Sequence, residues 1–194
     1  TDPATRQDAA SGGSVTALLI YMLQTNKIDG ALVCDTRIED GVPRPVFQIA
    51  TTPEQIRAAQ GSKYSAVYFT NHALPLIKSF EGGLAVVALP CDASILSRLM
   101  ANSDGLREKV RCVITLFCGH NSRPELVDAI VKKLQPEHTP PLKSYRFRYG
   151  HWRGKLRAEF ENDTVIEKPF SYFSDYRNLY FFAQQKCHHC FDHF

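Results

Sequence analysis

Four of the six cysteines in this 194-residue chain stand where thiolates could hold a metal centre. Cys187 and Cys190 form a C-x-x-C pair, whose two-residue gap lets both sulfurs face one centre. Cys91 and Cys118 each follow a short apolar run that is typical of a buried strand. The four thiolates suit either tetrahedral zinc or a 4Fe-4S cluster, and their spacing does not choose between the two.

The other cysteines and the nearby histidines have different contexts. Cys34 and Cys112 lie inside apolar, strand-like runs, where a free thiol packs as a small hydrophobic side chain, so we expect both in the core. A disulfide framework is not expected in a chain that carries no export signal. His188, His189 and His193 accompany the C-x-x-C pair and are either substitute ligands for zinc or solvent-facing side chains.

Two glycine-rich segments could bind a phosphate-bearing cofactor. The polar segment Ser11–Ser14 precedes a strongly apolar helix over 15–23, with Ser14 at the N-cap position. Free N–H groups at such a helix start suit a diphosphate or a flavin edge, although plain capping produces the same pattern. In Gly61-Ser62-Lys63, the lysine either neutralises phosphate or is solvated. Tyr64 is either a ligand contact or a packing aromatic.

The elements that position these residues have an α/β pattern. Segments 84–89 and 110–117 are short, apolar and rich in β-branched residues, which predicts buried strands, and each runs into a cysteine. Helices with suitable apolar spacing follow at 92–100 and 123–134. This order predicts a central, mostly parallel sheet with flanking helices, and it puts both cysteines at the ligand-binding edge. Further predicted elements are strands at 30–35 and 45–49 and a helix that begins at Pro53 and ends at Gly61.

The pattern changes after Pro140-Pro141. Alternating segments at 145–149, 155–160 and 164–168 are separated by turn residues, which predicts an antiparallel meander, followed by a cysteine-bearing C-terminal tail. We therefore expect a mixed α/β (α+β) fold in two parts that form one compact unit. Residues 1–140 make a cofactor-binding core, and residues 141–194 make the meander and the C-x-x-C tail.

Composition excludes several classes of protein. With 44% apolar residues the chain can bury one compact core. The chain contains no run of about 18 apolar residues, so no membrane span is predicted. The net charge of +3 gives no general nucleic-acid signature; the basic, aromatic stretch 143–157 is typical of a strand with one buried face, with Trp152 as a sheet anchor. The N-terminus lacks a signal-peptide pattern, which predicts a cytoplasmic protein. Both ends look cut from a longer chain.

Six motifs appear in a specific order along nearly the whole chain: Ser11 to Leu19, Gly61 to Tyr64, Leu89-Pro90-Cys91, Leu116 to His120, Gly150 to Leu156, and Cys187 to Asp192. This order resembles the beta-subunit family of coenzyme F-420 hydrogenases and dehydrogenases, with its bacterial flavin and iron-sulfur relatives. Each motif alone is weak, but six in the right order are specific. One departure is Asp92, at a position where many members carry Gln.

The resemblance implies an FAD-binding domain with a 4Fe-4S cluster near the flavin. Carried over by position, the cluster ligands are Cys91, Cys118, Cys187 and Cys190. The implied flavin contacts are Ser11, Gly12, Gly13, Ser14, Thr16, Gly61, Ser62, Lys63 and Tyr64. No catalytic residue is assigned.

The resulting expectation is an oxidoreductase of this beta-subunit type. FAD would exchange a hydride with a coenzyme F-420-like deazaflavin, a pyridine nucleotide or an unsaturated compound, and the cluster would link it to ferredoxin or a partner subunit. A homo-oligomer is compatible with this scheme. The alternative is a zinc-stabilised, non-catalytic binding or interaction module in which the four cysteines are structural. An inactive form of the flavoprotein is a third possibility.

Overall fold

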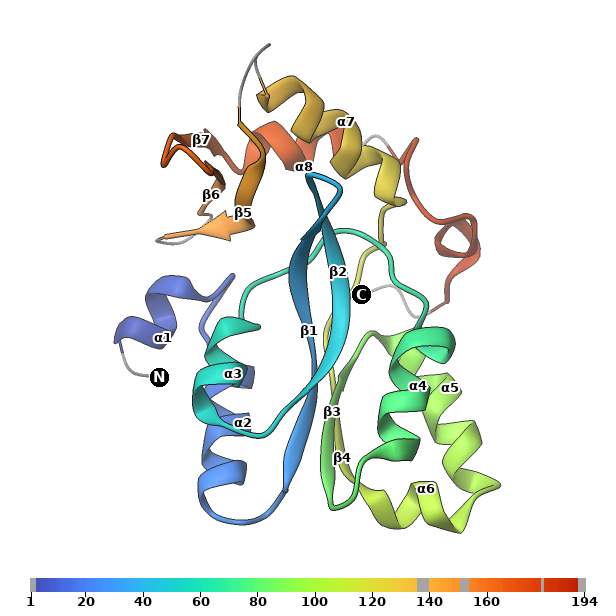
Figure 1. The fold of residues 1–194 in the computed structure, drawn as a ribbon. Helices are drawn as coiled ribbons and strands as arrows, with labels where there is room; N and C mark the ends of the chain where they lie inside the picture. The colour runs from blue at the N-terminus through green and yellow to red at the C-terminus, as the bar shows by residue number, and fades with distance from the viewer. Residues whose placement is uncertain (1–2, 136–139, 151–153, 179, 192–194) are drawn as a thin grey trace.

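The computed structural model describes residues 3–135, 140–150, 154–178 and 180–191 (Figure 1). Trp152 and His193, for which sequence suggested roles, lie outside these residues. The helices are α1 (Pro3–Asp8), α2 (Ser14–Gln24), α3 (Pro53–Ala58), α4 (Phe69–Ser79), α5 (Pro90–Ala101), α6 (Asp104–Lys109), α7 (Pro124–Leu134), α8 (Ser171–Asn178) and the 3-10 helix η1 (Gln185–His189). The strands are β1 (Gly30–Glu39), β2 (Val42–Ala50), β3 (Leu84–Ala88), β4 (Val110–Thr115), β5 (Leu142–Tyr149), β6 (Lys155–Phe160) and β7 (Val165–Pro169).

The first sheet has the strand order β2-β1-β3-β4. β3 is parallel to both β1 and β4, whereas β2 returns antiparallel to β1 as a long hairpin. β3 is buried along nearly its whole length, which explains why its sequence is a continuous apolar run. The predicted mixed α/β fold with a mostly parallel sheet is confirmed.

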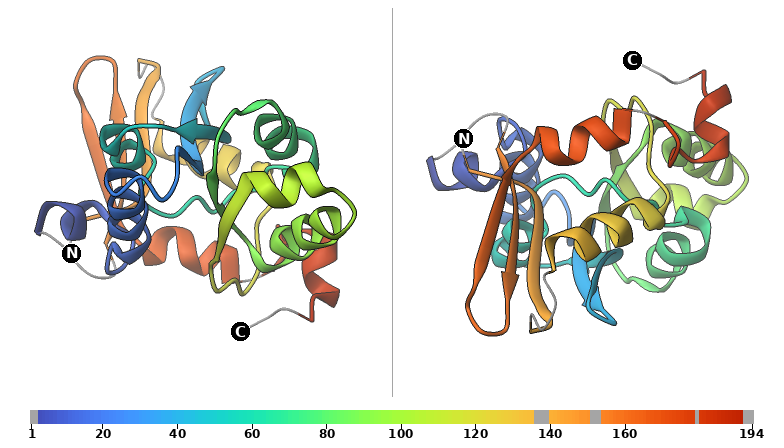
Figure 2. Two further views of the ribbon diagram at one scale, coloured as in Figure 1. Left: turned by 90° about the horizontal axis from the view of Figure 1, so that it is seen from below. Right: turned by 90° about the horizontal axis from the view of Figure 1, so that it is seen from above.

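Helices cover both faces of this sheet (Figures 1 and 2). Alternate strand residues point to opposite faces, so Leu32 and Val86 join one core cluster while Ala31 and Ala85 join the other. The first cluster packs against α4, α5 and α6, and the second packs against α2 and α3. The sheet is therefore held rigidly from both sides, and the chain segments that leave its edge start from fixed positions.

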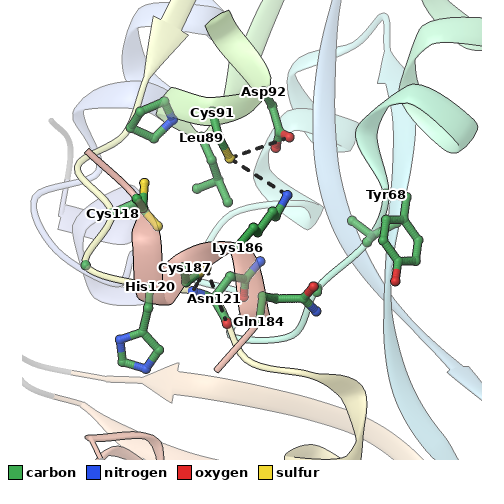
Figure 3. A pocket seen from close by; sticks show the side chains of 15 residues that line it. Tyr68, Leu89, Cys91, Asp92, Cys118, His120, Asn121, Gln184, Lys186 and Cys187 are labelled. Atoms are coloured by element: carbon green, nitrogen blue, oxygen red, sulfur yellow. Dashed lines mark hydrogen bonds between the residues drawn. The ribbon is translucent and has the colours of Figure 1, made fainter. Parts of the chain in front are cut away.

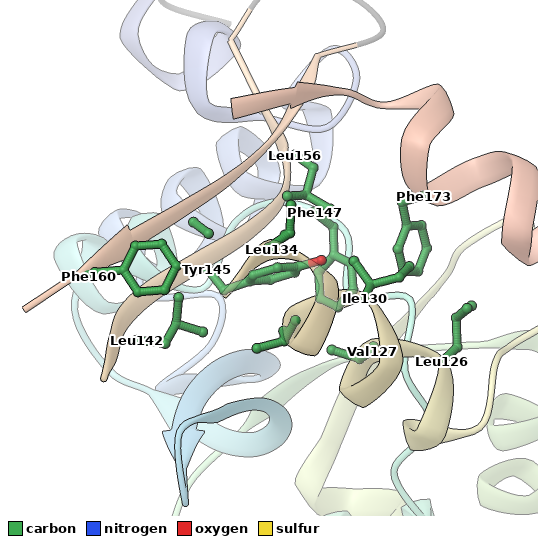
Figure 4. Packing of buried hydrophobic residues seen from close by; sticks show 12 residues of the cluster. Leu126, Val127, Ile130, Leu134, Leu142, Tyr145, Phe147, Leu156, Phe160 and Phe173 are labelled. Carbon is green, nitrogen blue, oxygen red and sulfur yellow. The ribbon is translucent and has the colours of Figure 1, made fainter. Parts of the chain in front are cut away.

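A second, antiparallel sheet, β5-β6-β7, packs against α7 and α8 (Figure 4). Tyr145 and Phe147 of β5 point into this core, together with Phe160 and Phe173. The expected meander and the strand with one buried face are both present. The core includes α7, which precedes Pro140, so residues on both sides of the proposed boundary share it. The boundary itself stays a prediction.

Some elements differ from the expectations. Helix α4 was not predicted because Pro75 interrupts its pattern, yet Phe69, Ala73 and Ile77 still form one buried face. Helix α8, in the aromatic run after β7, was also not predicted. The expected N-cap at Ser14 is wrong by one residue: Gly13 is the N-cap, with φ +73, and it makes no side-chain cap. Within the described residues, no helix is long and apolar enough to cross a membrane.

Candidate functional site

A pocket at the carboxyl ends of β3 and β4 is lined by all four cysteines that the sequence singled out, Cys91, Cys118, Cys187 and Cys190 (Figure 3). The two strands are parallel neighbours, so the segments that leave them meet at the same edge of the sheet. Segments separated by more than ninety residues thus converge on one place. Cys34 and Cys112 do not line this pocket, and Cys112 packs beside the core cluster under α2 and α3.

Cys91 lies in the first turn of α5, directly after Pro90 at the helix start. The sequence predicted Cys91 in the turn that leaves the strand, whereas the structure has it already inside the following helix. Proline is favoured in the first turn because the N–H it lacks has no partner inside the helix. A backbone hydrogen bond at Asp92, in the same turn, lowers the pKa of Cys91, which favours the thiolate.

The C-x-x-C pair is brought to the pocket by backbone hydrogen bonds between the chain after Cys118 and the C-terminal segment. The Arg123 N–H donates to Phe182 O at 2.6 Å, and the Gln184 N–H donates to Asn121 O at 3.0 Å. An isolated bridge between Ser122 and Ala183 lies between these bonds. They hold η1, which carries Cys187, over the edge of the first sheet.

Cys187 is the most buried of the four cysteines, with 8% of its surface exposed, and the others are half-buried. The Asn121 N–H donates to Cys187 Sγ at 3.5 Å. An N–H donor to sulfur stabilises negative charge on that atom, and this is the usual environment of a metal-bound thiolate.

Charges next to Cys91 act in opposite directions. Cys91 Sγ donates to Asp92 Oδ1 at 3.8 Å, and Lys186 Nζ lies 4.0 Å from the same sulfur (Figure 3). Burial raises the pKa of Cys91 to about 11, the Asp92 carboxylate raises it further, and the Lys186 ammonium lowers it. Burial also raises the pKa of Asp92, which is only 7% exposed. A proton, an ammonium or a metal must therefore compensate negative charge here.

The four cysteines do not form a ready site for a single ion. Within the described part of the chain, no three His, Cys, Asp or Glu side chains lie close enough together to hold one metal ion. A zinc ion needs its thiolates about 2.3 Å from one point, whereas in a 4Fe-4S cluster four cysteines share a much larger centre.

The histidines around the pocket differ in burial. His120 is 5% exposed, lines the pocket, and packs on the Tyr180 ring with the centroids 4.2 Å apart. His188 and His189 are exposed, and His193 lies outside the described residues. His120 is therefore the histidine that the structure holds in place at this site.

A second cavity, of about 470 Å³, opens between β1, the loop after α3, and β5. Its volume is in the range of about 300–1,000 Å³ that is common for small-molecule and cofactor sites. Three of the predicted flavin contacts, Gly61, Ser62 and Lys63, line it. Its other lining residues are Asp35, Thr36, Arg37, Ile38, Ala58, Gln60, Lys143, Ser144, Tyr145, Arg146, Phe147 and Arg148.

Lys63 is neither solvated nor free. Its ammonium donates to Ala59 O, and to Gln60 O and Gly61 O at 3.2 Å each, so it caps the carboxyl end of α3. Burial lowers its pKa. Gly61 has φ +95, a conformation that favours glycine, and this lets the chain turn back so that the lysine reaches these carbonyls. The loop is thus a rigid wall of the cavity.

The remaining predicted flavin contacts lie elsewhere. The Tyr64 ring packs against Phe147, Phe170 and Phe173, so its packing alternative is the one the structure contains. Ser11, Gly12 and Ser14 are exposed, Gly13 caps α2, and Thr16 is buried within α2. None of these residues lines either of the two cavities described above.

Several site residues escaped sequence reasoning. Lys186 and Asn121 reach the cysteines through tertiary contacts that leave no local pattern. The basic residues of β5 could have been found from the sequence. Arg146 and Arg148 alternate with two aromatic residues, so a strand that buries its aromatic face must present a basic opposite face. That opposite face lines the second cavity.

Comparison with known proteins finds two matching family models and several similar subunits. Residues 1–74 match the family model described as coenzyme F420 hydrogenase/dehydrogenase, beta subunit N-term, and residues 82–194 match the corresponding C-terminus model. The coenzyme F420 hydrogenase subunit beta of Methanothermobacter thermautotrophicus is 30% identical over 128 residues, which cover 62% of this chain and 44% of that protein. The subunit beta of Methanosarcina barkeri is 25% identical over 197 residues, covering 100% of this chain and 64% of that protein.

A solved structure is also similar. A chain of the F420-reducing [NiFe] hydrogenase complex from Methanosarcina barkeri superposes with a TM-score of 0.68 at 25% identity, covering 100% of this chain and 64% of that one. The chain therefore spans between about two fifths and two thirds of the length of these relatives.

Proposed function

Because the chain belongs to the coenzyme F420 hydrogenase/dehydrogenase beta subunit family, we propose that it is a flavin- and iron-sulfur-dependent electron-transfer oxidoreductase. The family comprises subunits of electron-transferring oxidoreductases. The finer part of the proposal is that this chain binds one 4Fe-4S cluster and one FAD. The observation that carries it is the convergence of four distant cysteines on a single pocket.

In this proposal Cys91, Cys118, Cys187 and Cys190 hold the cluster in the first pocket. The residues fit such a group: four thiols surround the pocket, and Asn121 N–H donates to one sulfur. The ammonium of Lys186 offsets negative charge at a second sulfur. Donors and positive charge next to the sulfurs stabilise a cluster that carries net negative charge.

The flavin is assigned to the second cavity, which is lined by Gly61, Ser62 and Lys63 and has a strongly basic wall. One chain segment joins the two sites. Lys63 lines the second cavity and Ala66 lines the first, and three residues of chain span at most about 11 Å. Groups bound in the two cavities therefore share a wall.

A flavin held in the second cavity would supply two-electron hydride chemistry, and an iron-sulfur cluster held by the four cysteines would supply one-electron transfer. The chain's own residues supply binding, orientation and charge. The rigid turn at Gly61 and the capped end of α3 keep one wall fixed, and burial of Cys187 limits the access of water to that sulfur. For the hydride carrier we propose a deazaflavin of the coenzyme F420 type, because relatives carry that coenzyme in their names, and for the electron partner ferredoxin or another subunit.

The test is a visible spectrum of anaerobically purified protein, together with iron, sulfide, zinc and flavin content. The proposal expects broad brown absorbance with superposed flavin bands, about four irons and one flavin per chain. A colourless protein with one equivalent of zinc would contradict it and support a zinc-stabilised interaction module instead. Iron without flavin, after reconstitution with both, would limit the proposal to the cluster.

A further inference from the structure

The wall of the second cavity that β5 contributes is chemically distinct from the opposite face of the same strand. Tyr145 and Phe147 enter the core against α7 and α8, as Figure 4 shows. Ser144, Arg146 and Arg148 alternate with them and so lie on the other face, toward the cavity. Because the aromatic face is buried, the pairing register of β5 is fixed, and this register directs the arginine side chains toward the cavity.

The cavity is lined by five basic side chains and one carboxylate. Three of the cations already have partners. Lys63 donates to the carbonyls directly after α3, Lys143 pairs with Asp163 at 2.9 Å and with Glu159 at 3.4 Å, and the Arg148 guanidinium lies over the Phe170 ring at 5.0 Å. The carboxylate, on Asp35, accepts from the Thr36 N–H and from Gln48, and it offsets only one of the five positive charges.

Arg146 differs from these cations. Its Nη1 is buried, and among the described residues it has no hydrogen-bond partner; its closest anion is Asp8 Oδ1, 3.9 Å away. The Gln60 Oε1 in the same cavity is likewise buried without a partner in the described chain, although Gln60 Nε2 donates to Thr5 O. A buried guanidinium nitrogen that makes no hydrogen bond is costly, so native structures rarely keep one without a ligand or water to accept from it.

We infer that Arg146 binds a phosphate group of the flavin nucleotide in the second cavity. This inference rests on the proposed function and deepens it by naming the residue and the ligand group. A guanidinium presents a planar fork of donors that matches phosphate oxygens, which an ammonium does not. The ribityl or ribose hydroxyls of the same ligand can donate to Gln60 Oε1. Asp8, at 3.9 Å, is a weak competitor for the fork that a phosphate displaces.

The test is fluorescence titration of flavin-depleted protein with FAD, FMN and riboflavin, comparing wild type with Arg146→Ala. We expect FAD and FMN to bind about tenfold or more weakly to the variant, while riboflavin, which has no phosphate, binds equally to both. Arg146→Lys should recover only part of the loss. Arg107→Ala is the matched control, because Arg107 is an exposed arginine in an ion pair on α6. Its flavin affinities should equal those of wild type.

Other outcomes would overturn the inference. Unchanged FAD affinity in Arg146→Ala would remove Arg146 from the site and leave the proposed function standing. An equal loss of riboflavin binding would indicate a structural role for the side chain. Asp8→Asn should bind FAD at least as tightly as wild type. Weaker FAD binding by this variant would show that Arg146 acts through its ion pair with Asp8 of α1 and not through the ligand.

Titration with ADP separates this inference from the proposed function. If wild type binds no flavin but binds ADP, and Arg146→Ala weakens ADP binding, then the phosphate site stands while the flavin proposal fails. If wild type binds neither flavin nor ADP, both are wrong.

Discussion

The ammonium of Lys186 lies 4.0 Å from the sulfur of Cys91, a residue 95 positions earlier in the chain. The contact joins the C-terminal segment to the first turn of α5 and brings a positive charge to a sulfur whose other neighbour is the buried Asp92 carboxyl. Positive charge and N–H donors at a ligand sulfur stabilise the more negative, reduced form of an iron-sulfur cluster.

Replacing Lys186 with Met should therefore lower the reduction potential of the proposed cluster. Since Lys186 is exposed and solvent screens its charge, we expect a shift of tens of millivolts at most. Anaerobic redox titration followed by electron paramagnetic resonance measures it. Lys132→Met, on the exposed surface of α7, is the control. A potential equal to that of wild type would show that Lys186 has no influence on the cluster.

Cys187→Ser should abolish the brown absorbance and most of the bound iron, while flavin binding stays largely intact, because Gly61, Ser62 and Lys63 line a different cavity. Cys112→Ala is the matched control, since Cys112 packs beside Met22 away from the pocket and should keep its full iron content. Iron and flavin analyses of both variants decide this. Equal iron in the two variants would remove Cys187 from the ligand set.

Gly13→Ala should destabilise the start of α2, and Gly12→Ala should not. Gly13 has φ +73, and a Cβ there would lie 3.0 Å from Thr5 Cγ2 and 3.2 Å from Thr5 O. A Cβ on Gly12 would meet only Ser14 Oγ, at an ordinary 3.7 Å. The left-handed conformation costs an L-residue about 1–2 kcal/mol, and the crowding adds to it. Chemical denaturation of both variants gives the difference, and equal midpoints would contradict the expected strain.

The two sheets are linked by an ion pair between Arg44 on β2 and Asp128 on α7, with Nη1–Oδ1 at 2.5 Å and Nη2–Oδ2 at 3.2 Å. Hydrogen bonding to Asp128 raises the pKa of Arg44. The pair is bidentate but partly exposed, so Asp128→Asn should cost about 1 kcal/mol at most. Asp104→Asn, in an exposed pair within α6, should cost less. The two unfolding midpoints, measured at low and at high salt, test this order.

The Cys34 thiol should react slowly with iodoacetamide at neutral pH. Burial raises its pKa to about 11 from the ordinary 9.0, and Lys63 opposes the rise. Alkylation requires the thiolate, so the rate should climb about tenfold per pH unit and level off only near the raised pKa. Because the folded pKa exceeds the unfolded one, the contribution to stability is complete below pH 9.0 and is lost as pH rises through about 11. A rate that levels off near 9 in folded protein, measured by mass spectrometry, would contradict the burial effect.

Local pattern alone predicted much of the first sheet. The run that became β3 was recognisable because a strand covered on both faces needs apolar, β-branched residues throughout. β4 was also predicted as a buried strand, and its burial was wrong: it is an edge strand whose Arg111 and Thr115 are exposed. The cysteines after them were correctly placed at one edge of the sheet, since parallel neighbours end on the same side. Helix α4 was missed because Pro75 weakens its local propensity, and its buried face against the sheet compensates for that.

The sequence by itself determined which side chains could carry chemistry: four thiols, a glycine-rich turn before α2, and a strand of alternating aromatic and basic residues. Only the tertiary structure decided which of them meet. It brought Lys186 and Asn121 to the cysteines, directed Tyr64 into the aromatic core, and turned the arginines of β5 toward the cavity beside Lys63. The physical reason is that these contacts join residues far apart in the chain. They follow from how two sheets and their helices pack, and no local propensity encodes them.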